Sequence, residues 1–106
     1  MAVMELDSAN FDEKVRGSGK VVLVDFSATW CGPCRAYGPI FHKVAEQNGD
    51  KAEFGSIDID ESGDIATRYG ITAVPTTIVF KGGEPVDSYL GGMDEKMLED
   101  LLARNL

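Results

Sequence analysis

The chain lacks the features that several classes of protein need. It has only two cysteines and one histidine, and its ten basic residues are scattered among eighteen acidic ones. No apolar run approaches the roughly 20 residues that cross a bilayer. Scattered basic residues do not form the patch that displaces the counterions of a nucleic acid or binds an anionic membrane surface. We therefore expect no nucleic acid and no membrane among its partners.

The N-terminal residues, MAVMELDSANF, also lack the basic segment and apolar core of an export signal. This absence predicts a cytoplasmic location, where thiols are normally kept reduced. The length of 106 residues and the 43% hydrophobic content are typical of one globular domain, residues 1–106. A chain of this length buries roughly 60–70% of its unfolded surface, so a disulfide framework is not needed to hold it together.

The apolar residues recur with the two-residue period of strands and the three- to four-residue period of helices. Strands are predicted at residues 3–6, 20–27 and 52–60, with a hairpin at 76–90, and helices at 9–19, 31–48, 62–70 and 93–106. We place a capping box at Asn10 and Glu13, a helix cap at Asp94 and the hairpin turn at Gly82-Gly83. The order βαβαβαββα predicts an α/β fold, with a central mixed sheet of four to five strands and four helices on both faces.

Two of these helices have one apolar face. In the helix at 31–48 this face consists of Cys34, Tyr37, Phe41, Val44 and Ala45, and in the last helix it consists of Met97, Leu98, Leu101 and Leu102. Pro39 lacks a backbone N–H, and its ring clashes with the carbonyl four residues earlier. We therefore expect the helix at 31–48 to kink at Pro39.

The two cysteines, Cys31 and Cys34, flank Gly32-Pro33 at the point where a strand pattern gives way to a helix pattern. In the first turn of a helix this spacing places both sulfurs on one side, close enough for a reversible disulfide. The unsatisfied N–H groups and partial positive charge of a helix N-terminus lower a cysteine pKa from about 8.5 to roughly 3.5–7.5. Cys31 is therefore the candidate nucleophile, and Cys34, one turn deeper, is the candidate resolving thiol.

An acid, Asp25, interrupts the apolar run KVVLVDFS just before the cysteines. The flanking residues are predicted to be buried on both sheet faces, namely Val22, Leu23, Val24 and Phe26. We therefore expect the strand and the helix to pack with the carboxyl near Cys34. Burial raises a carboxyl pKa toward neutrality, where a proton acceptor for the resolving thiol is most effective. The alternative is that Asp25 points into solvent from an edge strand.

Other roles for the cysteines fit the sequence less well. A structural zinc site takes four ligands, and two cysteines with the single histidine, His42, supply only three. Metal binding would therefore require a dimer that shares ligands. Two inert core cysteines would not need Gly-Pro between them, and we assign no role to His42.

Pro75, in ITAVPTT, comes just before the first strand of the hairpin. A proline there is compatible with an ordinary turn or strand start. If its peptide bond were cis, the backbone of Val74 would be exposed for a strand-like contact with a substrate peptide. The sequence leaves both possibilities open.

These features together resemble the thioredoxin family over essentially the whole chain: WCGPC after an aspartate-bearing strand, Pro39 in the next helix, AVPT, and a Gly-Gly hairpin before an amphipathic helix. The resemblance implies that Cys31 and Cys34 are the redox pair, Asp25 the buried acid and Pro75 a cis-proline. It also implies a substrate-docking surface around the exposed sulfur, formed by Trp30, Gly32, Pro33, Ala73, Val74, Pro75 and Gly91.

Members of this family reduce disulfides in proteins and are themselves re-reduced, most often by the NADPH-dependent flavoprotein thioredoxin reductase. The resemblance thus implies a protein disulfide reductase with no bound cofactor, whose partners are that reductase and disulfide-containing proteins. We expect a monomer without a metal. A disulfide oxidant or isomerase on the same fold is disfavoured by the missing export signal and by Gly-Pro between the cysteines. A non-catalytic binding module would not need the intact cysteine pair with Asp25.

A few positions depart from the common family pattern. Ser27 stands where a second tryptophan is usual, Arg35 where a lysine is usual, and Tyr37-Gly38 where an aliphatic residue and alanine are usual. Ser56 stands where many relatives have a lysine close to the buried acid. Loss of that cation removes an interaction that favours the carboxylate. We therefore predict that the Asp25 pKa is at least as raised as in relatives that keep the lysine.

Overall fold

Five strands form one mixed sheet at the centre of the molecule. The computed structural model describes residues 2–106 and places the strands in the order β1-β3-β2-β4-β5. The strands are β1 (Val3–Leu6), β2 (Val22–Ser27), β3 (Glu53–Asp58), β4 (Thr76–Lys81) and β5 (Glu84–Leu90). β1, β3 and β2 run parallel, whereas β4 and β5 extend the sheet in antiparallel fashion. The mixed α/β sheet predicted from the sequence is confirmed.

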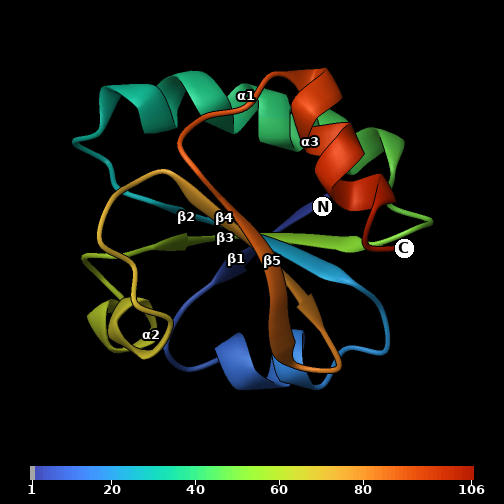
Figure 1. Cartoon of the computed structure of the whole chain (residues 1–106). Coiled ribbons are helices and arrows are strands. Elements are labelled where there is room, and N and C mark those ends of the chain that lie inside the picture. Colours follow the sequence, from blue (N-terminus) through green and yellow to red (C-terminus); the bar gives the residue numbers. More distant parts are fainter. Residues whose placement is uncertain (1) are drawn as a thin grey trace.

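Helices cover both faces of this sheet, as predicted. They are the short π-helix η1 (Asp12–Arg16), α1 (Gly32–Gln47), α2 (Gly63–Arg68) and α3 (Glu95–Ala103). Figure 1 shows α1 and α3 on one face and η1 and α2 on the other. The buried apolar side chains form two main clusters, one beneath α1 and α3 and one beneath η1 and α2. Within residues 2–106, no helix is long and apolar enough to cross a membrane.

The central strand, β2, sends its side chains alternately into these two clusters. Leu23 packs beneath α1 and α3, whereas Val22, Val24 and Phe26 pack on the side of η1 and α2. Because side chains alternate along a strand, Asp25 shares the face of Leu23 and points toward α1. The central strand therefore holds its one acid directly beneath the helix that carries the cysteines.

Helix α1 begins immediately after Cys31, which is its N-cap residue. Pro33 lies in the first turn, where a missing N–H costs no intrahelical hydrogen bond. Pro39 lies inside the helix, which continues to Gln47, and the kink expected there stays a prediction. The buried residues are the ones that the sequence pattern predicts, namely Cys34, Tyr37, Phe41, Val44 and Ala45.

The capping box predicted at Asn10 and Glu13 is wrong. Asn10 does not cap a following turn; its Oδ1 accepts from the Asp7 N–H at 2.8 Å, and its Nδ2 donates to the Glu5 carbonyl at 3.0 Å. The Asp7 Oδ1 accepts from the N–H groups of Ala9 and Asn10 in the turn before the helix, and the N-cap residue of η1, Phe11, makes no side-chain cap. The helical segment that follows is a single π-helical stretch, η1.

The hairpin turn and the cap of the last helix form as predicted. Gly82 and Gly83 have φ angles of 58° and 80°, and a Cβ on Gly83 would lie only 3.1 Å from the Arg16 Cα. Asp94 caps α3, since its Oδ1 accepts from the Met97 N–H at 2.8 Å. Met97 itself is 38% exposed, so the buried face of α3 is narrower than predicted and consists of Leu98, Leu101 and Leu102.

Candidate active site

The two cysteines are joined as a disulfide at the N-terminus of α1, with their Cα atoms 5.2 Å apart. Cys31 precedes the first turn, and its Sγ accepts a hydrogen bond from the Cys34 N–H at 3.2 Å. That N–H is one of the donors that a helix N-terminus leaves without an intrahelical partner. The site therefore offers the Cys31 sulfur a hydrogen bond and the positive end of the helix dipole, both of which favour a thiolate after reduction.

A second segment, just before β4, lies against the same sulfur. The Val74–Pro75 peptide bond is cis, and the Val74 carbonyl oxygen is 3.7 Å from the Cys31 Sγ. The Gly91 N–H, after β5, donates to the Pro75 carbonyl at 2.8 Å. The fold thus brings together Cys31, Val74, Pro75 and Gly91, which are far apart in the sequence.

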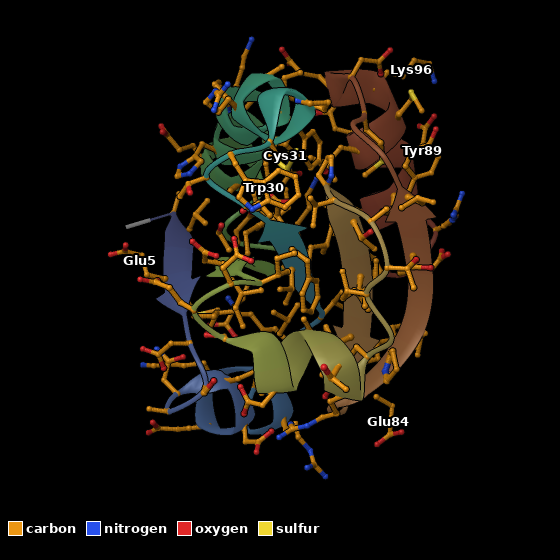
Figure 2. The ribbon with its side chains drawn as sticks, turned by 90° about the vertical axis from the view of Figure 1, so that its left-hand side faces the viewer. Glu5, Trp30, Cys31, Glu84, Tyr89 and Lys96 are labelled. Atoms are coloured by element: carbon orange, nitrogen blue, oxygen red, sulfur yellow. A yellow bond between two sulfur atoms is a disulfide. The ribbon has the colours of Figure 1, made fainter. Side chains whose placement is uncertain are left out.

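Exposed residues surround this sulfur on its solvent side. Trp30 is 65% exposed and lies beside Cys31 in Figure 2, and its Nε1 donates to the Asp60 Oδ2 at 2.7 Å. The other exposed positions of the predicted docking surface are Gly32, Pro33 and Ala73. Asp60 was not predicted as a site residue, because no local sequence pattern reports a contact across thirty residues.

Asp25 lies in β2, on the face of the sheet that α1 covers. It is 3% exposed, and its Oδ1 has no hydrogen-bond partner. Burial raises the pKa of this carboxyl from 3.8 to about 7. β2 has neighbours on both sides, so the alternative of a solvent-facing acid on an edge strand is wrong. The structure thus combines a cysteine pair at a helix N-terminus with a buried acid that can take up a proton near neutral pH.

Comparison with known proteins agrees with this arrangement. The family model described as Thioredoxin matches residues 2–104. The chain belongs to the thioredoxin family. It is 42% identical over 102 residues, 96% of each chain, to a thioredoxin of Alicyclobacillus acidocaldarius, and 40% identical over 106 residues, the full length of both, to one of Staphylococcus aureus. Its fold matches the crystal structure of Malassezia sympodialis thioredoxin with a TM-score of 0.86 and 40% identity, covering 96% of this chain and 89% of that one.

Membership of the thioredoxin family identifies the class of reaction. The curated relatives are thioredoxins, and this chain keeps the cysteine pair in a geometry that forms a disulfide. The protein is therefore a thiol-disulfide oxidoreductase with a redox-active cysteine pair. This class of reaction, disulfide reduction, agrees with the expectation from the sequence.

Ser56 and Tyr37, two of the positions that depart from the thioredoxin pattern, lie close to the buried acid. Ser56 is directly opposite Asp25 in the β2–β3 ladder, and Thr77 is directly opposite it in the β2–β4 ladder. On α1, the Tyr37 hydroxyl is 2.9 Å from the Thr77 Oγ1, and both residues are buried. Thr77 was missed as a candidate, because it is the second of two threonines at the start of β4 and threonine is common in strands. The acid thus has hydroxyl-bearing residues as neighbours on both adjacent strands.

The remaining departures lie nearer the surface. Arg35 donates from Nη1 to the Thr29 carbonyl at 2.9 Å, and Ser27 is half-buried at the end of β2, opposite Asp58. Among residues 2–106, no group of three or more His, Cys, Asp or Glu side chains could hold a metal ion. The exposed His42 on α1 is not part of the site.

Proposed function

We propose that this protein reduces disulfide bonds in other proteins, with Cys31 as the attacking thiolate and Cys34 as the resolving thiol. The observation that carries the proposal is the placement of the Cys31 Sγ at the N-cap of α1, 3.2 Å from the Cys34 N–H and next to exposed residues. Both cysteines are only 5% exposed, so burial does not separate them. Their positions do, because Cys31 precedes the helix next to the exposed Trp30, whereas Cys34 lies inside the first turn of α1.

In the first step, the Cys31 thiolate attacks one sulfur of the substrate disulfide. A new S–S bond forms between Cys31 and that sulfur, the substrate S–S bond breaks, and the other substrate sulfur leaves as a thiolate that takes a proton from solvent. The helix N-terminus favours the thiolate form of Cys31, which is the form that attacks.

In the second step, the Cys34 thiol gives its proton to the Asp25 carboxylate, and its sulfur attacks Cys31. The Cys31–Cys34 disulfide forms, and the remaining substrate sulfur leaves as a thiolate. The enzyme dithiol has then lost two electrons, and the substrate disulfide has gained them. A pKa of about 7 suits Asp25 to this role, since the carboxyl can both accept and return a proton at working pH.

We also propose that substrate proteins dock on the surface formed by the exposed Trp30, Gly32, Pro33 and Ala73 and the half-buried Val74 and Gly91, while Pro75, which is buried, positions the Val74 backbone. The contact of the Val74 carbonyl with the Cys31 Sγ supports this, because a peptide that pairs with this backbone would present its sulfur to Cys31. The exposed Trp30 ring adds apolar contact area beside the sulfur.

The oxidised pair must be reduced again for turnover. We propose that an NADPH-dependent thioredoxin reductase supplies the electrons, so that the protein needs no cofactor of its own. We also propose that it acts as a single-domain monomer. Membership of the thioredoxin family supports this partner. The cytoplasmic location stays a prediction from the sequence.

Reduction of insulin tests the proposal, with dithiothreitol or a reductase and NADPH as the electron source. The wild-type protein should turn over, and Cys31→Ser should have no activity. Asp25→Asn should be slower at neutral pH, while Asp100→Asn, which changes an exposed carboxyl on α3, should match the wild type. If Cys31→Ser reduced insulin as fast as the wild type, Cys31 would not be the nucleophile.

A further inference from the structure

The starting observation is a polar pair in the core between the sheet and α1. The Tyr37 hydroxyl and the Thr77 Oγ1 form a hydrogen bond of 2.9 Å, and the two residues are only 1% and 0% exposed. The apolar side chains around this pair cannot form hydrogen bonds with its two hydroxyl groups. Buried hydroxyl groups of this kind usually belong to a network in which every donor has an acceptor.

The number of protons shows that this pair has one donor to spare. Two hydroxyl groups carry two protons, and their mutual hydrogen bond uses one of them. The phenol is the more acidic group, so Tyr37 is the better donor and Thr77 the acceptor. The Thr77 hydroxyl proton is then free to donate to a third group.

The acceptor for this proton is directly across the sheet. Thr77 pairs with Asp25 in the antiparallel β2–β4 ladder, and residues so paired have Cβ atoms roughly 4.5–5.5 Å apart on the same face. Among the described residues, the Asp25 Oδ1 is the one buried side-chain oxygen or nitrogen without a hydrogen-bond partner. A spare donor and an unpaired acceptor therefore occupy neighbouring positions.

We propose that Tyr37 and Thr77 form a hydroxyl chain that serves Asp25: Tyr37 donates to Thr77, and Thr77 donates to the Asp25 carboxylate. In this chain Thr77 is the donor to Asp25, and Tyr37 is a positioning residue that acts through Thr77. The structure shows no hydrogen bond between Thr77 and the Asp25 Oδ1, so the proposed bond requires rotation of the hydroxyl or the carboxyl. This inference rests on the proposed role of Asp25 in the resolving step. When Asp25 takes up the Cys34 proton, the chain reverses, so that the carboxyl donates to Thr77 and Thr77 to Tyr37. No proton leaves either hydroxyl.

The other groups that face Asp25 do not include a cation that would stabilise its carboxylate. On the α1 side, Asp25 is faced by Ser56 from β3, Thr77 from β4, and the buried face of α1 with Cys34 and Tyr37. Of these, only the thiol and the phenol titrate, and burial keeps the Tyr37 pKa above its usual value, so the phenol stays neutral and able to donate.

The nearest charged side chains on these elements point elsewhere. Asp58, two residues beyond Ser56 on β3, accepts from the backbone N–H groups of Asp60 and Glu61. Arg35 on α1 donates to the Thr29 carbonyl. No cation from these two elements is therefore turned toward the carboxylate, and the stabilisation of its charge depends on hydroxyl donors.

The test is an NMR titration of the Asp25 carboxyl in the oxidised protein. Thr77→Val removes the donor and keeps the shape, so it should raise the Asp25 pKa by about one unit. Tyr37→Phe should raise it by less, the double variant should match Thr77→Val, and Thr77→Ser should restore the wild-type pKa. Tyr69→Phe, which removes a phenol hydroxyl on the opposite face of the sheet, should have no effect.

An unchanged or lowered Asp25 pKa in folded Thr77→Val overturns the proposal, as does an unchanged pKa in Tyr37→Phe. If Thr77→Val does not fold, Tyr37→Phe and Thr77→Ser decide the question by the same criteria.

A second readout separates this proposal from the function on which it rests. A coloured thiol is attached to Cys31 as a mixed disulfide, and its release reports the attack by Cys34. The pH of half-maximal release should move upward with the Asp25 pKa in Thr77→Val. If Asp25→Asn leaves the pH profile of release unchanged, Asp25 is not the proton acceptor, whereas the titration still decides whether the hydroxyl chain contacts it.

Discussion

Asp25 shows how one residue can lower the stability of a fold and still serve its chemistry. The carboxyl is 3% exposed, and burial raises its pKa from 3.8 to about 7. Between these two pH values the native state binds a proton that the unfolded state has lost. Because stability falls with pH wherever the native state binds more protons, the protein loses stability as pH rises from about 4 to 7. The difference amounts to about 4 kcal/mol above pH 7.

Replacement of this acid should remove that loss. In Asp25→Asn the side chain cannot ionise, so we expect its free energy of unfolding to exceed that of the wild type by an amount that grows between about pH 4 and 7 and then stays constant. Urea denaturation at several pH values measures this difference. The control Asp100→Asn should follow the wild type, and a pH-independent difference for Asp25→Asn would contradict the buried, titrating acid.

Residue patterns predicted Asp25 but not its neighbours. The apolar run around it favoured burial but left a solvent-facing position on an edge strand as the alternative, which the strand order and the 3% exposure of Asp25 exclude. The importance of Thr77 depends on the register between β2 and β4, which the sequence does not contain. The cis state of Val74–Pro75 could not be derived either, because the two isomers of an X-Pro bond differ by only about 0.5–1 kcal/mol and tertiary contacts choose between them.

At the level of elements, the cap at Asp94 was predicted correctly, and its Oδ1 accepts from the Met97 N–H. Cys31 was predicted in the first turn of its helix, and the structure shows that it is the N-cap residue, whose Sγ accepts from the Cys34 N–H. The capping box at Asn10 failed because that side chain had other partners within reach, the Asp7 N–H and the Glu5 carbonyl. Local pattern therefore indicates that a helix begins, but competition among nearby polar groups decides which residue caps it.

The cap of α3 can be tested by a single substitution. Asp94→Ala removes the hydrogen bond from Asp94 Oδ1 to the Met97 N–H and should lower the free energy of unfolding by about 1 kcal/mol. The matched control is Glu99→Ala, which removes an exposed carboxylate in the middle of the same helix. Chemical denaturation of both variants should show a loss for Asp94→Ala alone; equal values would mean that the cap does not hold the helix end.

At the scale of the whole molecule, the site is assembled from segments that meet only in the folded chain. β2 supplies Asp25, α1 the cysteine pair, the segment before β4 supplies Val74 and Pro75, and Gly91 follows β5. The order of these elements could be predicted from hydrophobic periodicity. The order of the strands in the sheet could not, because long-range pairing leaves no local trace in the sequence.

The central proposal is that the two sulfurs have different roles, with Cys31, which caps α1 beside the exposed Trp30, as the nucleophile and Cys34, in the first turn of α1, as the resolving thiol. The most direct test is to capture the complex with a disulfide-bonded substrate and to map its bond by mass spectrometry under non-reducing conditions. Cys34→Ser should accumulate a substrate linked through Cys31, whereas Cys31→Ser should accumulate no adduct. A substrate linked to Cys34 in Cys31→Ser, at the same rate as the Cys31 adduct forms in Cys34→Ser, would contradict this division of labour.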